Sequence, residues 1–199
     1  MGVAEAIAYR LSGGLFDRKR RLRLNPDYLE YESEYLRPNH FTRVYKEDIV
    51  DIRHDMEWIY WYRFLVGCEF RVEVKTKASA VLSIKFVSYF NRNAAYQEAY
   101  ETIVDRLWEF YLNDIVDAYL DTFSATHTIA LRGVRLTDEG IYFVDKDQLI
   151  IWENVAVKEY EDYYALYDRK NPELNRRIEY DEWESEILFG IIESLKEVY

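Results

Sequence analysis

One long amphipathic segment in the middle of the chain, residues 93–123, limits what this protein can fold into. Its apolar residues fall in adjacent pairs four positions apart: Ile103/Val104, Leu107/Trp108, Tyr111/Leu112, Ile115/Val116 and Tyr119/Leu120. This spacing is typical of an α-helix and not of a strand. Because a helix turns about 100° per residue, a step of four overshoots one turn by roughly 40°, and the apolar stripe moves around the helix. We therefore expect the first half of this helix to pack on the strands before it and the second half on the strands after it.

The moving stripe leads to expectations for particular residues. Trp108 should be buried against the preceding sheet, whereas Tyr119 and Phe123 should contact the C-terminal module. An alternative stays open, in which the helix breaks at Asn113-Asp114 because Asn113 can act as the N-cap of a second helix.

Sheet-forming sequence lies on both sides of this helix. Short strand-like runs separated by turn residues are expected at 20–24, 29–35, 41–46, 49–53, 58–66, 69–75 and 80–87. Turn signals about every ten residues favour an antiparallel barrel or sandwich over βαβ units. The same pattern resumes after residue 128 and ends in a second amphipathic helix. Sheet followed by helix thus occurs twice.

The predicted fold class is α+β, with two modules joined by the long central helix. Each module is expected to be a bent antiparallel β-barrel or sandwich of about seven strands, closed by a C-terminal helix. We expect an N-terminal helix at 1–15, the first module at 16–112, a helical connector at 113–128 and the second module at 129–199. The N-terminal helix is predicted because Val3, Ile7 and Leu11 share one helical face.

Parts of the two halves also correspond residue by residue. The segment at 23–31, RLNPDYLEY, lines up with RLTDEGIYF at 135–143. Further along, Glu47-Asp48-Ile49 lines up with Glu153-Asn154-Val155. We interpret the chain as a tandem repeat.

The second half carries a family resemblance. The hairpin that ends in 138–143, the strand pair at 149–155 and the terminal helix from Glu182 resemble those of uncharacterised bacterial proteins with tandem pleckstrin-homology-like (PH-like) modules. The resemblance covers most of residues 16–199. It implies binding and not catalysis. The loops that would flank a lipid site, 25–27 and 138–140, are acidic, which argues against phosphoinositide binding.

Charge and cysteine content exclude several classes of function. The net charge of -11 repels nucleic acid, so no nucleic-acid partner is expected. The single cysteine, Cys68, allows no disulfide framework and suits a cytoplasmic protein. We expect neither a signal peptide nor a membrane span.

The stretch around residue 60 is the strongest candidate for an interface. Trp58, Tyr60, Tyr62 and Phe64 alternate with Ile59 and Trp61, so a strand here has two large apolar faces. Such a strand is either buried on both sides or exposed as a binding patch. The candidate interface residues are Trp58, Tyr60, Trp61 and Tyr62.

A dense basic cluster near the N-terminus is a second candidate. It comprises Arg18, Lys19, Arg20, Arg21 and Arg23. These cations either dock an anionic partner or form salt bridges with the acidic run at 30–34.

No catalytic constellation is apparent. Carboxylates spaced by four along the central helix lack the histidines that helical metal sites use. Cys68 could act as a nucleophile with His40 or His127 as its base, but nothing in the sequence fixes their proximity. The sequence therefore predicts no enzyme activity, no cofactor and no metal.

The expected function is that of a non-catalytic binding or scaffold protein that recognises a protein or peptide partner. Recognition by strand addition at a sheet edge, or in a groove beside a helix, suits such modules. The alternative is a membrane-surface adaptor that binds acidic headgroups through the N-terminal helix and the basic cluster. A homo-oligomer stays open.

Overall fold

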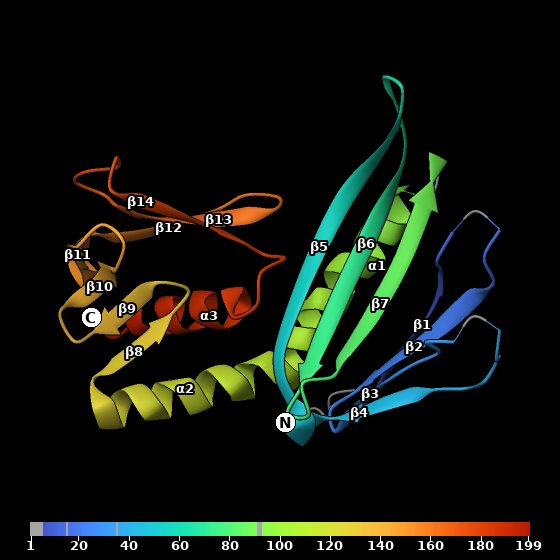
Figure 1. Cartoon of the computed structure of the whole chain (residues 1–199), viewed down its shortest axis with the longest axis horizontal. Helices are drawn as coiled ribbons and strands as arrows, with labels where there is room; N and C mark the ends of the chain where they lie inside the picture. Colours follow the sequence, from blue (N-terminus) through green and yellow to red (C-terminus); the bar gives the residue numbers. More distant parts are fainter. Residues whose placement is uncertain (1–5, 15, 35, 91–92) are drawn as a thin grey trace. The chain divides into compact units, whose positions relative to one another are not determined.

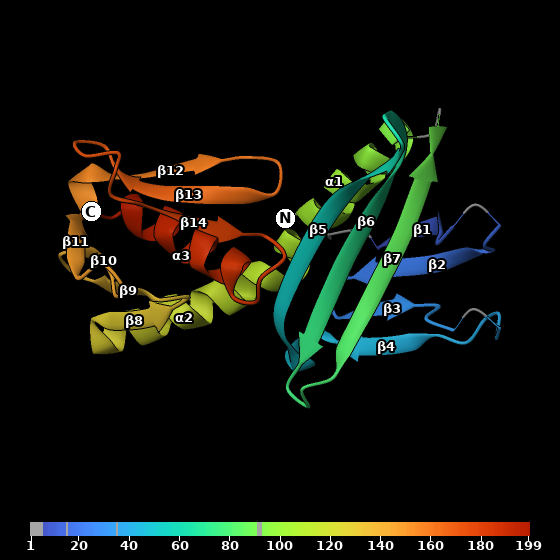
Figure 2. The same cartoon turned by 45° about the horizontal axis from the view of Figure 1, so that its top comes forward.

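The structure, a computed structural model, describes residues 6–14, 16–34, 36–90 and 93–199. The chain divides into two compact units, Met1–Leu112 and Asn113–Tyr199. Figures 1 and 2 show the elements that make up each unit.

The first unit contains two antiparallel sheets and a helix. The four-stranded sheet has the order β1-β2-β3-β4, with bounds Ile7–Ser12, Lys19–Asn25, Tyr28–Tyr31 and Thr42–Tyr45. After the 3₁₀ turn η1 (Lys46–Asp48), the three-stranded sheet has the order β5-β6-β7, with bounds Ile49–Trp61, Phe64–Thr76 and Val81–Tyr89. The helix α1 is Asn93–Leu107, and a π-helical segment, η3, extends it over Trp108–Leu112.

The core of the first unit lies between these elements. Figure 1 shows α1 along one face of the β5–β7 sheet. Phe70 and Phe86 stack there with ring centroids 5.0 Å apart, and Tyr100 of α1 lies 5.0 Å from Phe70. The Tyr111 hydroxyl donates to the backbone carbonyl of Asn25 at 2.6 Å, and burial raises the pKa of Tyr111. The end of the helical segment is therefore fixed to the β2–β3 turn.

The second unit repeats the order of elements. It begins with α2 (Asn113–Thr126) and the strands β8 to β11, which are Thr128–Leu131, Val134–Thr137, Gly140–Phe143 and Gln148–Ile151. The 3₁₀ turn η4 (Trp152–Asn154) leads to β12-β13-β14, with bounds Val155–Glu159, Tyr163–Asp168 and Asn175–Glu179. The last helix, α3, is Ser185–Lys196.

The helix α3 covers one face of the β12–β14 sheet. Tyr164 on β13 is fully buried, and its hydroxyl donates to the Ser185 carbonyl at 2.9 Å. Its ring meets that of Phe189 edge-on at 5.3 Å. Leu166 and Ile178 are buried on the same face. The opposite face of this sheet therefore carries the solvent-facing side chains.

The predicted fold class is wrong about closure. The described strands form four separate open sheets, and none closes into a barrel. The reason is visible at η1 and η4, where a 3₁₀ turn ends one sheet and the next strand starts another. The aligned segments Glu47-Asp48-Ile49 and Glu153-Asn154-Val155 each span the end of such a turn and the first residue of the next strand, so they occupy equivalent positions in the two units.

The N-terminal helix predicted at 1–15 is also wrong over the described residues. Ile7–Ser12 form the strand β1, which pairs with β2 so that Leu11 lies opposite Arg20. Exposed and less exposed residues alternate along it, because Ile7, Tyr9 and Leu11 point to one side. Ile7 and Leu11 are four residues apart, a spacing that fits one face of a strand as well as one face of a helix. Pairing with β2 decides for the strand. Val3 lies outside the described residues.

The central helix differs from its prediction at Trp108. This residue is only half-buried, whereas Leu107, Tyr111 and Leu112 are buried. The π-helical geometry of Trp108–Leu112 explains the shift, because it adds a residue to the turn and rotates the apolar stripe.

No described residue between α1 and α2 leaves the helical conformation, so the alternative break at Asn113 is absent. Phe123 is buried in the second unit, where α2 packs on β8 and α3.

No helix in the described part of the chain is both long enough and apolar enough to cross a bilayer.

Candidate functional site

A two-stranded ribbon at the end of the β5–β6 hairpin is the main candidate site. The strand β5 spans Ile49–Trp61, and its pairing with β6 shifts register between Ile49 and Asp51 and again between Ile59 and Tyr60. A two-residue loop, Tyr62-Arg63, joins it to β6. The described ladder between β6 and β7 ends where Gly67 pairs with Tyr89. Residues 59–66 therefore extend past the third strand of the sheet, as Figure 1 shows. We call these residues the aromatic tip.

Large apolar side chains of the aromatic tip face solvent. They are Tyr60, Trp61, Tyr62, Phe64 and Leu65. Trp61 is 74% exposed and Tyr62 is 94% exposed. Leaving each such side chain in water forgoes roughly 1.5–3 kcal/mol of burial free energy. A contiguous exposed patch of this kind marks an interaction site on a folded protein.

The backbone at the loop is strained. Tyr62 has a φ of 61°, in the left-handed region where a bulky L-residue costs about 1–2 kcal/mol. Two-residue hairpin loops normally place glycine, asparagine or aspartate at such positions. With its ring almost fully exposed, Tyr62 gains no packing within the fold that offsets this strain. Backbone strain that no packing interaction within the fold offsets is often found at functional positions.

We expect Tyr62→Gly to leave the free energy of unfolding unchanged or to raise it by up to about 1 kcal/mol, because glycine adopts positive φ without strain. Urea denaturation followed by circular dichroism measures this. A loss of more than about 1 kcal/mol would show that the Tyr62 ring stabilises the fold itself.

The structure changes the predicted interface in detail. The expected strand at 58–66 is instead a hairpin. The turns expected between the runs 49–53, 58–66 and 69–75 are also wrong, because residues 54–57 lie within β5 and residues 67–68 lie within β6. Tyr60, Trp61 and Tyr62 are exposed, whereas Trp58 is half-buried at the base of the tip. Phe64 and Leu65 also belong to the exposed set, although neither is among the four candidate interface residues.

The base of the aromatic tip is charged, whereas the tip itself is nearly uncharged. Arg63 is the one charged residue between Trp58 and Cys68. Just below it, Glu69 pairs with Arg71 at 2.9 Å and with Lys85 at 2.6 Å. Burial raises the pKa of Glu69, but the two cations outweigh burial and lower it. On this face of the sheet, three charged residues therefore lie next to the apolar tip.

The arginines of the basic cluster are engaged within the first unit. Arg18 and Arg21 each lie 3.4 Å from a carboxylate oxygen of Glu32. Arg23 contacts Glu30 at 3.1 Å. Arg20 pairs with Asp17, and its guanidinium also donates to the carbonyl of Lys85, whereas Lys19 is exposed. An anionic partner would have to compete with these ion pairs, so the patch formed by Arg18, Lys19, Arg20, Arg21 and Arg23 stays an untested prediction.

Residues considered for chemistry are dispersed. Cys68 is fully buried and its thiol points to the Glu69 carbonyl at 3.7 Å. His40 lies beside Glu34, and His127 lies beside Asp138. Among the described residues, no three histidine, cysteine, aspartate or glutamate side chains gather as a metal site would require.

The chain matches no protein-family model, no curated protein and no solved structure. The resemblance to tandem PH-like modules therefore stays a sequence-based hypothesis.

Proposed function

We propose that this chain is a non-catalytic binding protein, and that its aromatic tip inserts into an apolar cleft on a protein partner. The observation that carries the proposal is the exposure of Tyr60, Trp61, Tyr62, Phe64 and Leu65 on a ribbon that extends past its own sheet.

The composition of the aromatic tip supports a protein partner. Tryptophan, tyrosine and arginine are the residues most enriched among the few that dominate binding energy at protein interfaces. All three occur here, in Trp61, Tyr62 and Arg63. Side chains on both faces of the ribbon are exposed, so a partner must enclose it from two sides to bury them. A cleft fulfils this requirement better than a flat surface.

The structure supports binding to a membrane surface less than it supports binding to a protein partner. The predicted N-terminal amphipathic helix is the strand β1 over its described residues, and the arginines of the basic cluster already face Glu30 and Glu32. A net charge of -11 also repels anionic lipid. The single cysteine supports a reducing compartment such as the cytoplasm as the place of this function.

The test compares Trp61→Ala with a matched control, Phe16→Ala. Phe16 is 92% exposed and lies between β1 and β2 of the same unit, outside the tip. Both variants remove a solvent-facing aromatic ring, so both should keep the stability of the wild type. Partners crosslinked to the wild type in cells are identified by mass spectrometry, purified and titrated against each variant. We expect Trp61→Ala to weaken binding at least about 30-fold, as for an interface hot spot, and Phe16→Ala to leave it unchanged.

Three results decide the proposal. It fails if no identified protein discriminates Trp61→Ala from Phe16→Ala. It also fails if the chain sediments with phosphatidylcholine vesicles in a manner that depends on Trp61, because the tip then binds lipid. A dimer seen in analytical ultracentrifugation and lost in Trp61→Ala supports it and identifies the partner as a second copy of the chain.

A further inference from the structure

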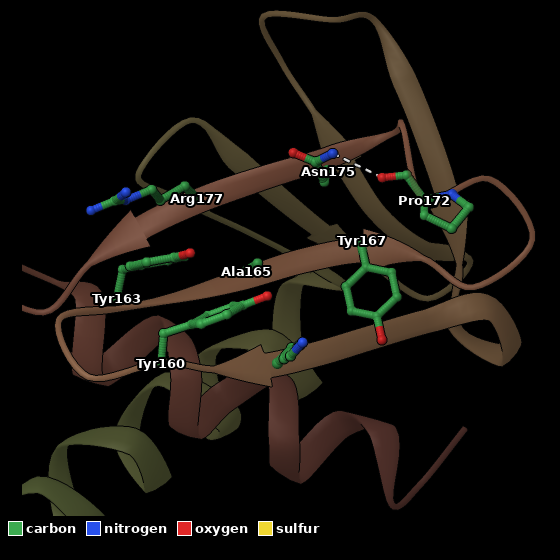
Figure 3. Close-up of a pocket in the computed structure, with 8 residues that line it drawn as sticks. Tyr160, Tyr163, Ala165, Tyr167, Pro172, Asn175 and Arg177 are labelled. Carbon is green, nitrogen blue, oxygen red and sulfur yellow. Dashed lines mark hydrogen bonds between the residues drawn. The ribbon is translucent and has the colours of Figure 1, made fainter.

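A pocket on the solvent-facing side of the β12–β14 sheet has the features of a ligand site. It has a volume of about 510 Å³, within the range of small-molecule sites. Figure 3 shows the rings of Tyr160 and Tyr163 on one side of Ala165 and that of Tyr167 on the other. We call this pocket the tyrosine notch, and its lining includes Lys158, Tyr160, Tyr163, Ala165, Tyr167 and Arg177.

Strand geometry explains why a notch forms here. Tyr163, Ala165 and Tyr167 occupy alternate positions of β13, so their side chains share the face opposite the core. The small side chain of Ala165 between two tyrosines leaves a depression. The cross-strand neighbours of Ala165 are Lys158 on β12 and Arg177 on β14. Aromatic rings therefore border the depression along the strand, and cations border it across the sheet.

One side of the notch is held in place by stacking and ion pairs. The rings of Tyr160 and Tyr163 stack with centroids 4.5 Å apart and an interplanar angle of 15°. The Arg177 guanidinium lies 3.8 Å from the Tyr163 centroid and pairs with both Glu179 and Asp162. Because two carboxylates neutralise Arg177, its role here is to position the ring pair.

Lys158 differs from Arg177 in its electrostatic surroundings. Its Nζ lies 4.9 Å from the Tyr160 centroid, and in the described part of the chain no carboxylate forms an ion pair with it. The Tyr160 hydroxyl beside the ammonium raises the pKa of Lys158, which keeps the charge in place at neutral pH. Lys158 is thus a cation held at the notch, in a chain whose net charge is -11.

The rim near Tyr167 is also ordered by local hydrogen bonds. The Asn175 side-chain amide donates to the Pro172 carbonyl at 2.8 Å and to the Glu173 carbonyl at 3.2 Å. Figure 3 shows the first of these bonds. Beneath the sheet, the buried face that carries Tyr164 packs on α3. The notch is therefore borne by a supported sheet and not by a loop.

From this geometry we propose that the tyrosine notch binds a ligand group that joins one anionic head, a carboxylate or phosphate, to a flat apolar body. The head contacts the Lys158 ammonium, and the body lies on Ala165 between Tyr160 and Tyr167. A charge-assisted contact and ring stacking are the two interactions that these side chains supply together. This site is separate from the aromatic tip and does not depend on the proposed function.

The probes separate the head from the body. Phenyl phosphate and benzoate carry both parts, whereas inorganic phosphate carries only the head and benzyl alcohol only the body. Titrations of the full chain are followed by NMR, with signals assigned for the tyrosine rings and the backbone of β12 to β14. We expect saturable shifts at Tyr160, Ala165 and Tyr167 with phenyl phosphate or benzoate. Binding of inorganic phosphate and of benzyl alcohol should each be at least about tenfold weaker.

Two variants test the two contacts. Lys158→Gln removes the cation, and Ala165→Leu fills the depression; each should weaken binding of phenyl phosphate about tenfold or more. Lys77→Gln is the matched control, since Lys77 is an exposed lysine in the β6–β7 turn of the other unit, and it should bind as the wild type does. Circular dichroism confirms that each variant keeps its fold. If Ala165→Leu fails to fold, Lys158→Gln alone decides.

The proposal is overturned if phenyl phosphate and benzoate produce no saturable shifts at the notch, or if Lys158→Gln binds as tightly as Lys77→Gln. It is also overturned if inorganic phosphate binds as strongly as phenyl phosphate, because the site would then recognise only charge.

If the titrations confirm binding at the notch, peptides with a phosphotyrosine or a glutamate next to an aromatic residue are compared with the free probes. Tighter binding of the peptides would identify the source as a protein segment, and equal or weaker binding would identify a small molecule.

Discussion

Replacing Phe86 by alanine should lower the free energy of unfolding of the first unit by about 3–5 kcal/mol. Phe86 is fully buried, its ring stacks on Phe70 at 5.0 Å, and the rings of Tyr96 and Tyr100 lie 6.1 and 6.3 Å from it. Truncation opens a cavity among rings on two strands and a helix, which cannot all collapse into it. Urea denaturation followed by far-ultraviolet circular dichroism gives the loss.

Trp108→Ala provides the control for this prediction. Tryptophan is the larger side chain, but Trp108 is only half-buried on the helical segment, so its loss should be smaller than that for Phe86→Ala. A larger loss for Trp108→Ala would restore the expectation that Trp108 is buried against the preceding sheet, and would contradict a core centred on Phe70 and Phe86.

Glu32→Gln should lower the free energy of unfolding by about 2 kcal/mol at neutral pH. Glu32 is 2% exposed, and its carboxylate accepts hydrogen bonds from the backbone N–H groups of Arg21 at 2.8 Å and Asn39 at 2.7 Å. Arg18 and Arg21 flank it at 3.4 Å. Glutamine keeps the shape but brings an N–H₂ group, which cannot accept, toward these donors. Partial exposure of the two arginines keeps the expected loss below that of a fully buried pair.

This loss should depend on pH. Burial raises the pKa of Glu32, but the N–H groups of Asn39 and Arg21 and the Arg21 guanidinium outweigh burial and lower it from 4.5 to about 2. A lowered folded-state pKa means that the carboxylate stabilises the fold fully above its unfolded value and progressively less as the pH falls toward the folded value. The difference between wild type and Glu32→Gln should therefore shrink as the pH falls below 4.5 toward 2.

Denaturant titrations of both proteins at several pH values measure this difference. Glu34→Gln is the control, because the Glu34 side chain is 43% exposed and pairs with Arg37 at the surface. It should change stability by less than about 0.5 kcal/mol. If the difference in free energy of unfolding between wild type and Glu32→Gln stays constant from neutral pH into the acid range, the ionised carboxylate of Glu32 is not what stabilises the fold here.

Features that depend on near neighbours in the chain could be predicted from the sequence. The step of four between Ile103 and Leu120 predicted a helix, and the structure is helical throughout that range. The strand-like runs at 20–24 and 29–35, with turn residues between them, predicted the β2–β3 hairpin, although β3 ends already at Tyr31. These signals are local, because periodicity and turn chemistry are set within a few residues.

The aromatic tip shows where local signals stop. Its aromatic residues were identified from the sequence, but they were placed in one strand because the loop Tyr62-Arg63 has none of the residues that usually mark a hairpin turn. Whether these side chains are core or surface depends on where the ladder to β7 ends, at Gly67, and that is a property of another strand.

The sequence by itself thus determined the helices that the step of four marks, many of the turns and the set of large aromatic side chains. Only the tertiary structure decided which of those side chains meet solvent and which residues become neighbours. Lys158, Ala165 and Arg177 form the tyrosine notch because the registers of β12, β13 and β14 place them side by side. A slip of one residue would turn each side chain to the other face. Register depends on which face of each strand is buried against α3. This burial is a non-local property, so the residue types at Lys158, Ala165 and Arg177 do not by themselves indicate that they become neighbours.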